Sequence, residues 1–228
     1  MPDYEIKKWD KNAFNIHSVK WVEEAYLNKK YAFAADYIRL YALYNYGGIY
    51  LDMDVEVCKT FNPFLNLRTM LCWQRGFNMG LEVAVLGVEK GCEWIGKCLN
   101  AYNGRRFLLQ DGSFDLQILP SRIEEELRAM NYSLVSVLNI KEAYNLQKAD
   151  NTIPIFPYTY FSPKSYITGR IKRTGNTVAI HHFAGSWLPH SGTPLAKKIK
   201  NRLWNQTGFA DLEIKRRLLY FIKFFKRT

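Results

Sequence analysis

The chain has 228 residues, of which 48% are hydrophobic and 23% are charged. These values are typical of a folded domain that can bury a core, and they exclude a disordered or low-complexity chain. The net charge of +11 is concentrated at the end, because residues 195–228 hold ten Lys or Arg and only two acids. No recognition motif accompanies this basic tail, so the charge does not indicate nucleic-acid binding.

Four cysteines occur in the chain: Cys58, Cys72, Cys92 and Cys98. They form no C-x-x-C pair and their spacing suits no zinc site. The sequence shows no signal peptide and no apolar run that is long enough to span a bilayer. We therefore expect reduced thiols and a cytoplasmic protein.

The hydrophobic pattern predicts helices that alternate with strands. In chain order we expect a strand at 4–9, helices at 19–27 and 32–46, strands at 49–57, 69–73 and 82–88, helices at 93–102 and 121–130, an irregular segment at 153–166, a strand at 177–182, and helices at 195–204 and 211–227. Gly47 and Gly48 end the second helix, as glycine does at a helix C-terminus. The alternation favours an α/β sandwich around a mostly parallel sheet.

An acidic row marks the strand expected at 49–57. Apolar and polar residues alternate there without a break, so Asp52, Asp54 and Glu56 would share one face, with the two aspartates roughly 7 Å apart. A solvated strand face also tolerates such a row. Here the opposite face is apolar and the acids lie near the carboxyl end of the strand, which is where ligands bind in open α/β sheets. Clustered carboxylates suit a hard divalent cation, which could bridge the phosphates of a nucleoside diphosphate.

The residues around this row carry a specific resemblance. The segments AADYIR (34–39) and GGIYLDMD (47–54) closely resemble the sugar-binding D-x-D region of glycosyltransferase family 32. That family includes yeast outer-chain mannosyltransferases and bacterial capsule and lipopolysaccharide enzymes, and clostridial toxin glucosyltransferase domains share the pattern more distantly. The resemblance implies a GT-A fold, in which helices sandwich a Rossmann-like, mostly parallel sheet. It also implies retaining transfer of a hexose from a nucleotide sugar, with a UDP-sugar favoured and GDP-mannose as the alternative.

Individual roles follow from the same resemblance. Asp36 and Arg39 lie three apart on one side of a helix and match the acid and arginine that hold the donor's ribose and its sugar or phosphate. A surface ion pair is the alternative. Tyr50 matches an aromatic residue beside the donor, although packing would also explain it. Asp52 matches a residue that touches ribose, sugar or metal-bound water, and Asp54 matches the direct ligand of Mn²⁺ or Mg²⁺. Asp54, Asp52 and Arg39 are thus the expected catalytic residues, and both aspartates are expected at the metal.

A second motif, HHFAGSW at residues 181–187, resembles the segment that closes over the diphosphate and metal in this family. It implies that His182, Ser186 and Trp187 bind the donor and that His182 is also a metal ligand. Adjacent strand residues point to opposite faces, so only one histidine can reach a given site. We favour His182 over His181 by position, and a structural histidine is the alternative.

Two further positions match loosely, and one feature of the family is missing. Asn78 and Glu82 fall where the family lines its cleft, although turn and surface positions are the simpler explanations. Family members usually begin earlier, with a strand that is central in the sheet and a Trp that stacks on the base. Nothing similar precedes Tyr4, so either the sequence is truncated or the base is held differently. No nucleophile is evident, which favours attack on the same face as the leaving diphosphate over a covalent intermediate.

We expect two regions, a glycosyltransferase domain at 1–194 and a basic amphipathic helical tail at 195–228. The tail sets an apolar stripe opposite Lys and Arg, which suits an anionic bilayer surface, and packing on the domain is the alternative. The expected acceptor is a glycan or lipid-linked glycan in capsule, exopolysaccharide or lipopolysaccharide synthesis, with the enzyme peripheral on the inner face of the plasma membrane. Two other functions stay open: an effector that glycosylates a protein, and a non-catalytic glycan- or nucleotide-binding module.

Overall fold

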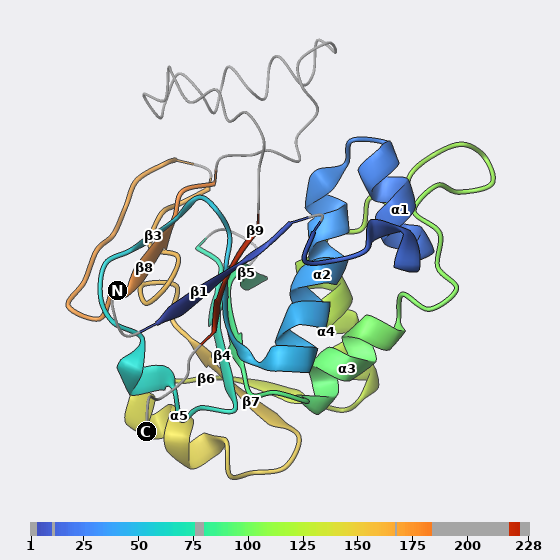
Figure 1. Ribbon diagram of the computed structural model, residues 1–228. Helices are drawn as coiled ribbons and strands as arrows, with labels where there is room; N and C mark the ends of the chain where they lie inside the picture. Colours follow the sequence, from blue (N-terminus) through green and yellow to red (C-terminus); the bar gives the residue numbers. More distant parts are fainter. Residues whose placement is uncertain (1–3, 11, 76–79, 167, 184–218, 224–228) are drawn as a thin grey trace.

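A mixed β-sheet separates two layers in the computed structural model, which describes residues 4–10, 12–75, 80–166, 168–183 and 219–223 (Figure 1). The sheet contains, in spatial order, β1 (Glu5–Trp9), β9 (Leu219–Lys223), β2 (Gly48–Leu51), β5 (Leu81–Val88), β4 (Thr69–Trp73), β7 (Thr152–Phe156) and β6 (Ser133–Ser136). Two more strands, β3 (Val55–Val57) and β8 (Ala179–His181), form a separate antiparallel ribbon.

The expected α/β class is confirmed, but the expected mostly parallel sheet is wrong. Strands β1, β9, β2, β5 and β4 pair antiparallel, and only β4 with β7 and β7 with β6 pair parallel. The connections explain this mixture. The short link between β4 and β5 allows only an antiparallel return, whereas a helix crosses over between β6 and β7 and makes that pair parallel.

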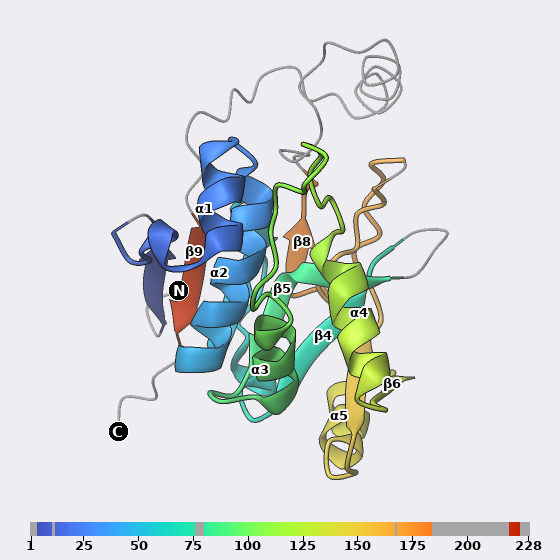
Figure 2. The ribbon, with the colours of Figure 1, turned by 90° about the vertical axis from the view of Figure 1, so that its right-hand side faces the viewer.

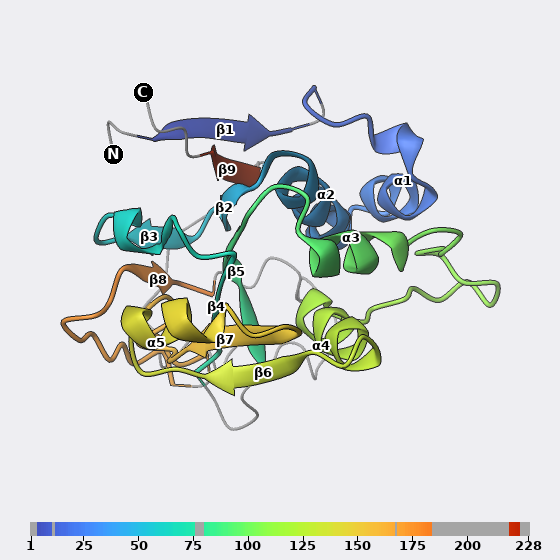
Figure 3. The same ribbon diagram turned by 90° about the horizontal axis from the view of Figure 1, so that it is seen from below.

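The helices lie mainly on one side of the sheet. This layer consists of α1 (Lys20–Leu27), α2 (Tyr31–Tyr46), α3 (Glu93–Asn100) and α4 (Leu119–Ala129) (Figure 2). The other side carries the β3–β8 ribbon, α5 (Ile140–Leu146) and the short 3-10 helix η2 (Asn62–Phe64), as the view from below shows (Figure 3). Another 3-10 helix, η1 (Ile16–Ser18), precedes α1. Each layer packs its own apolar cluster against the sheet.

Helix α2 and strand β2 meet at a glycine that the geometry requires. Gly47 ends the helix with φ of 65°, and a Cβ atom added there would lie 2.6 Å from the backbone nitrogen of Lys90. A larger residue would therefore be strained both by conformation and by contact. The tight join fixes the direction in which β2 leads toward the two aspartates.

Several expected elements differ in the structure. The strand expected at 49–57 is two strands in two sheets, separated by a turn. The segment expected to be irregular contains β7, and β6 and α5 were not expected at all. Residues 219–223, expected in a helix, form β9, because pairing with both β1 and β2 outweighs their local helical pattern. The helix expected at 195–204 lies outside the described residues. Within the described residues, no helix is long and apolar enough to cross a membrane.

Candidate active site

The two aspartates lie in a turn at the end of β2. The backbone N–H of Val55 donates to the carbonyl of Asp52 over 3.1 Å, which closes the turn. Asp52 is anchored by its own N–H, which donates to Ala84 on β5 over 2.9 Å, and the carbonyl of Asp54 accepts from the N–H of His182 over 2.9 Å. Backbone bonds to β5 and to the residue that follows β8 therefore hold the turn with both aspartates at the carboxyl end of β2.

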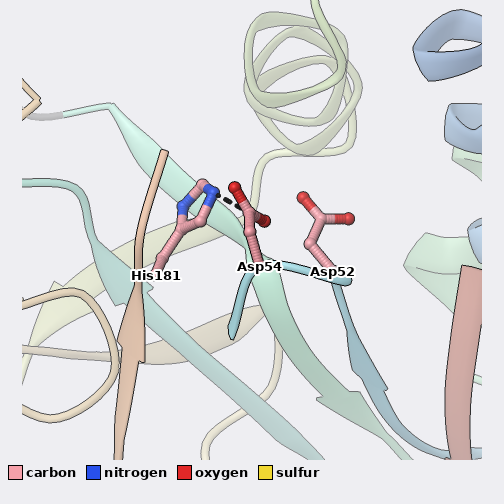
Figure 4. Close-up of side chains that lie close together, drawn as sticks. All are labelled: Asp52, Asp54 and His181. Carbon is pink, nitrogen blue, oxygen red and sulfur yellow. Dashed lines mark ion pairs between the residues drawn. The ribbon is translucent and has the colours of Figure 1, made fainter. Parts of the chain in front are cut away.

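The turn brings Asp52 and Asp54 together with His181 of β8 (Figure 4). One ligand atom from each residue lies within 4.8 Å of the others, and the Nε2 atom of His181 is 3.5 Å from Oδ1 of Asp54. All three side chains are partly buried. Two carboxylate oxygens and one imidazole nitrogen form a donor set that suits a divalent cation such as Mn²⁺ and leaves coordination positions for other oxygens. The side chains therefore fit the metal that the D-x-D pattern implies.

The structure corrects the preference for His182 as the histidine of this site. His182 follows His181 directly and points to the opposite face of the ribbon, where its Nε2 atom lies 2.9 Å from Oε2 of Glu56. Glu56 also pairs with Arg173 over 2.7 Å and does not extend the row of Asp52 and Asp54 as expected. The turn at Asp52 breaks the alternation of faces that this expectation assumed. Ser186 and Trp187 lie outside the described residues.

Arg39 occupies the centre of a second group beside the turn. One of its terminal nitrogens lies 3.2 Å from Oδ1 of Asp36 and 3.4 Å from Oδ1 of Asp52, and the other donates to the carbonyl of Val83 over 3.0 Å. The guanidinium stacks over the ring of Tyr50, whose hydroxyl donates to Asp52. The structure thus joins four sequence-predicted residues, and their burial excludes a surface ion pair.

Burial shapes the electrostatics of this group. It raises the pKa of Asp36 to about 7, with Arg39 opposing the shift and Asp52 adding to it. Burial also raises the pKa of the Tyr50 hydroxyl well above its ordinary value. A carboxyl whose pKa is displaced this far is common at functional sites. The buried guanidinium of Arg39 lies between the carboxyl groups of Asp36 and Asp52, so the group presents a rigid polar wall to the site.

Three side chains near the turn gained no firm role from the sequence. Glu82 of β5 is 4% exposed and lies 3.1 Å from Nδ1 of His181. Ser162 donates to the same carboxylate over 2.8 Å. Lys164 is buried and donates to the carbonyl of His182 over 2.8 Å. Burial lowers the pKa of its ammonium group, and the charge of Asp54 opposes that shift. For Glu82 the sequence does contain a signal, because this acid stands inside the apolar run LEVAVLGV at 81–88. Asn78 lies outside the described residues.

Burial lowers the pKa of His181, but this effect is exceeded by the charge of Glu82 and by hydrogen bonds to Asp54 and Glu82. Together they raise the pKa to about 10. Without a cation the imidazole ring is therefore protonated on both nitrogens, and it forms ion pairs with the carboxylates of Asp54 and Glu82. A cation that binds there takes the place of that proton, as metal binding at histidine generally requires.

Comparison with known proteins identifies the class of this site. Residues 1–70 match the family described as a glycosyltransferase sugar-binding region containing the DXD motif. The chain therefore carries a sugar-binding D-x-D region of the glycosyltransferases, and the class expected from the segments at 34–39 and 47–54 is confirmed.

One curated relative and one solved structure are similar to parts of the chain. Over 94 residues the chain is 34% identical to inositol phosphoceramide mannosyltransferase 3 of Schizosaccharomyces pombe (strain 972 / ATCC 24843). This alignment covers 40% of the chain but only 26% of that protein, so the chain spans about a quarter of the relative's length. The structure of PaToxG glycosyltransferase aligns with 82% of this chain and 57% of its own chain, at 18% identity and a TM-score of 0.32.

Proposed function

We propose that the protein transfers a hexose from a nucleotide sugar to a glycan acceptor with retention at the anomeric carbon. A UDP-sugar is the favoured donor and GDP-mannose the alternative. The observation that carries this proposal is the set of Asp52, Asp54 and His181, which lies directly beside the buried pair of Asp36 and Arg39. The first set suits a cation on the diphosphate, and the second offers a charged wall for the sugar or phosphate.

The side chains have separate tasks in this proposal. Asp52, Asp54 and His181 would hold a divalent cation, which supplies Lewis acidity toward the diphosphate when bound. Arg39 and the hydroxyl of Tyr50 fix the orientation of Asp52 before the donor arrives, so little reorganisation is needed during the reaction. Asp36 offers its carboxyl to sugar hydroxyls. The acceptor hydroxyl then attacks the anomeric carbon on the face from which the diphosphate leaves. The bond from that carbon to the diphosphate breaks, and the proton of the hydroxyl passes to the leaving phosphate.

The proposed class of acceptor rests on the curated relative and on the charge of the chain. The relative is named as a mannosyltransferase of inositol phosphoceramide, and this supports the alternative donor, a mannosyl donor, and a lipid-linked acceptor here. The ten Lys or Arg in residues 195–228 favour an anionic membrane surface, where lipid-linked glycans lie. Synthesis of a capsule, an exopolysaccharide or a lipopolysaccharide fits such an acceptor.

The test is Mn²⁺-dependent release of nucleoside diphosphate from a panel of UDP- and GDP-sugars. We expect slow hydrolysis of one donor, and a loss of roughly a hundredfold or more in Asp54→Ala or with a chelator, because such metals contribute several kcal/mol. Asp150→Ala is the control, since this exposed acid lies outside the site. Turnover that neither the chelator nor Asp54→Ala affects would contradict the proposal, and donor binding without any turnover would favour a binding module instead.

A further inference from the structure

We propose that Glu82 is a positioning residue for the cation site, and that it fixes the ring orientation and tautomer of His181 so that Nε2 faces Asp54. This inference rests on the proposed function, because it gives a role to the second shell of that same site. Glu82 would not touch the cation or the donor itself. It would act through His181.

The position of Glu82 is the first argument. All eight residues of β5 are buried, and Glu82 is the only acid among them. Burying a carboxylate costs free energy unless it is paired and hydrogen-bonded, and an apolar residue would pack in a central strand without that cost. An acid in this position therefore indicates a task other than packing.

The contacts of the carboxylate also support this role, because both of its oxygens have hydrogen-bond partners. Its Oε1 atom accepts from the backbone N–H of Ala84 over 2.9 Å. Its Oε2 atom accepts from the hydroxyl of Ser162 over 2.8 Å and lies 3.1 Å from Nδ1 of His181. Ser162 is itself fully buried. The N–H of Ala84 and the hydroxyl of Ser162 thus fix the position of the carboxylate that faces the imidazole ring.

The geometry of the ring is the third argument. With the proton of His181 on Nδ1 and shared with Glu82, the lone pair of Nε2 is free for a cation on the side of Asp54. The ring of Phe183 packs on His181 with centroids 4.0 Å apart and limits its rotation from another direction. Carboxylates that hold the outer nitrogen of a histidine ligand raise its basicity and fix its orientation. Glu82 stands in that relation to His181.

The experiment measures Mn²⁺ binding directly, by electron paramagnetic resonance of free Mn²⁺ titrated with the full chain and no donor present. We expect Glu82→Gln to weaken Mn²⁺ binding ten- to a hundredfold, which is the usual cost of losing such a partner. Ser162→Ala should weaken binding in the same direction but less. Glu124→Gln is the matched control, because that carboxylate also accepts from a backbone N–H of β5, at Leu81 over 2.9 Å, but pairs with no histidine among the described residues.

The outcomes separate this inference from the proposed function. If the wild-type chain binds Mn²⁺, loses it in Asp54→Ala, and keeps its affinity within twofold in both Glu82→Gln and Ser162→Ala, the positioning role is overturned while the cation site stands. If the wild-type chain binds no Mn²⁺, the cation site and the positioning role both fall. Thermal unfolding of each variant without metal shows whether it is folded, and Ser162→Ala decides the matter if Glu82→Gln does not fold.

Discussion

Arg39 shows how the site combines stability with function at the scale of single residues. Its guanidinium contacts Asp36, Asp52 and the carbonyl of Val83 while 6% of the residue is exposed. We expect Arg39→Ala to lower the free energy of unfolding by about 3–5 kcal/mol, because two carboxylates lose their buried partner. Urea denaturation checks this. Arg105→Ala is the control, since Arg105 pairs with Asp115 at the surface and should cost no more than about 1 kcal/mol. Equal losses in the two variants would contradict the prediction.

Asp36 gives a pH dependence whose sign is opposite to that of an ordinary surface acid. Burial raises its pKa to about 7 in the folded chain, whereas the unfolded value is near 4. Between these values the folded state binds a proton that the unfolded state has released, so this group lowers stability as pH rises from about 4 to 7. Above about pH 7 the penalty is complete, and it amounts to a few kcal/mol at most.

The variant Asp36→Asn removes this titrating group. We expect this variant to gain stability relative to the wild-type chain as pH rises from 4.5 to 8, while its donor hydrolysis falls. Melting temperatures of both proteins across that range are the measurement. Parallel curves would show that Asp36 does not titrate in this window. A variant that gains stability but keeps full turnover would remove Asp36 from the donor site.

The sequence predicts which residues form the site better than it predicts where their side chains point. Asp36, Arg39, Tyr50 and Asp52 meet as the motif implies, because a helix and an adjacent strand fix their relation locally. The choice between His181 and His182 depends on the register of β8 against β3, where Val55 faces His181. That register joins segments more than a hundred residues apart, and no local pattern contains it.

At the scale of elements, an alternating pattern concealed the turn that forms the site. Residues 49–57 alternate as one strand would, yet the chain turns at Asp52 and enters a second sheet at Val55. The apolar alternation survives because the buried Ile49 and Leu51 of β2 and the partly buried Val55 and Val57 of β3 pack in the same apolar cluster. Strand β7 was missed for another reason. It contains Pro154, which usually argues against an inner strand, although β7 lies between β4 and β6.

Glu24 of α1 fastens the loop before α4 to the helical layer. Its carboxylate accepts from the side chain of Arg106 and from the backbone N–H groups of Phe107 and Leu108, over 2.9 and 3.0 Å for the latter two. We expect Glu24→Gln to cost about 1.5–3 kcal/mol, the range for hydrogen bonds to a charged group. Hydrogen exchange should accelerate at residues 107 and 108.

The matched control for this prediction is Glu23→Gln. Glu23 neighbours Glu24 on the same helix, but within the described part of the chain its side chain pairs only with the exposed side chains of Lys20 and His17. Its loss should leave exchange at 107 and 108 unchanged, because exposed ion pairs contribute little. Faster exchange in both variants would mean that α1 as a whole has loosened and that Glu24 is no specific fastener.

At the scale of the whole molecule, the sheet is completed by a segment far along the chain. Strand β9 pairs with β1 on one side and β2 on the other, so it separates the first strand of the chain from the strand that leads into the site. The apolar and aromatic residues of this segment fit a helix or a strand equally well. Pairing with the edges of β1 and β2 makes this segment a strand, and a local pattern does not reveal such non-local pairing.

This arrangement makes a prediction that separates a built-in strand from an independent tail. A chain ending at residue 218 would lose β9 and leave the edges of β1 and β2 unpaired, and exposed edges favour association between chains. We expect its melting temperature to fall by at least about 4 °C, which corresponds to roughly 1–2 kcal/mol for a chain of this size. Size-exclusion chromatography should show larger species. A chain ending at residue 223 keeps β9 and should match the full chain in both measurements. If the chain ending at 218 melts and elutes like the full chain, residues 195–228 form the separable tail that the sequence suggested, and β9 has no part in stabilising the sheet.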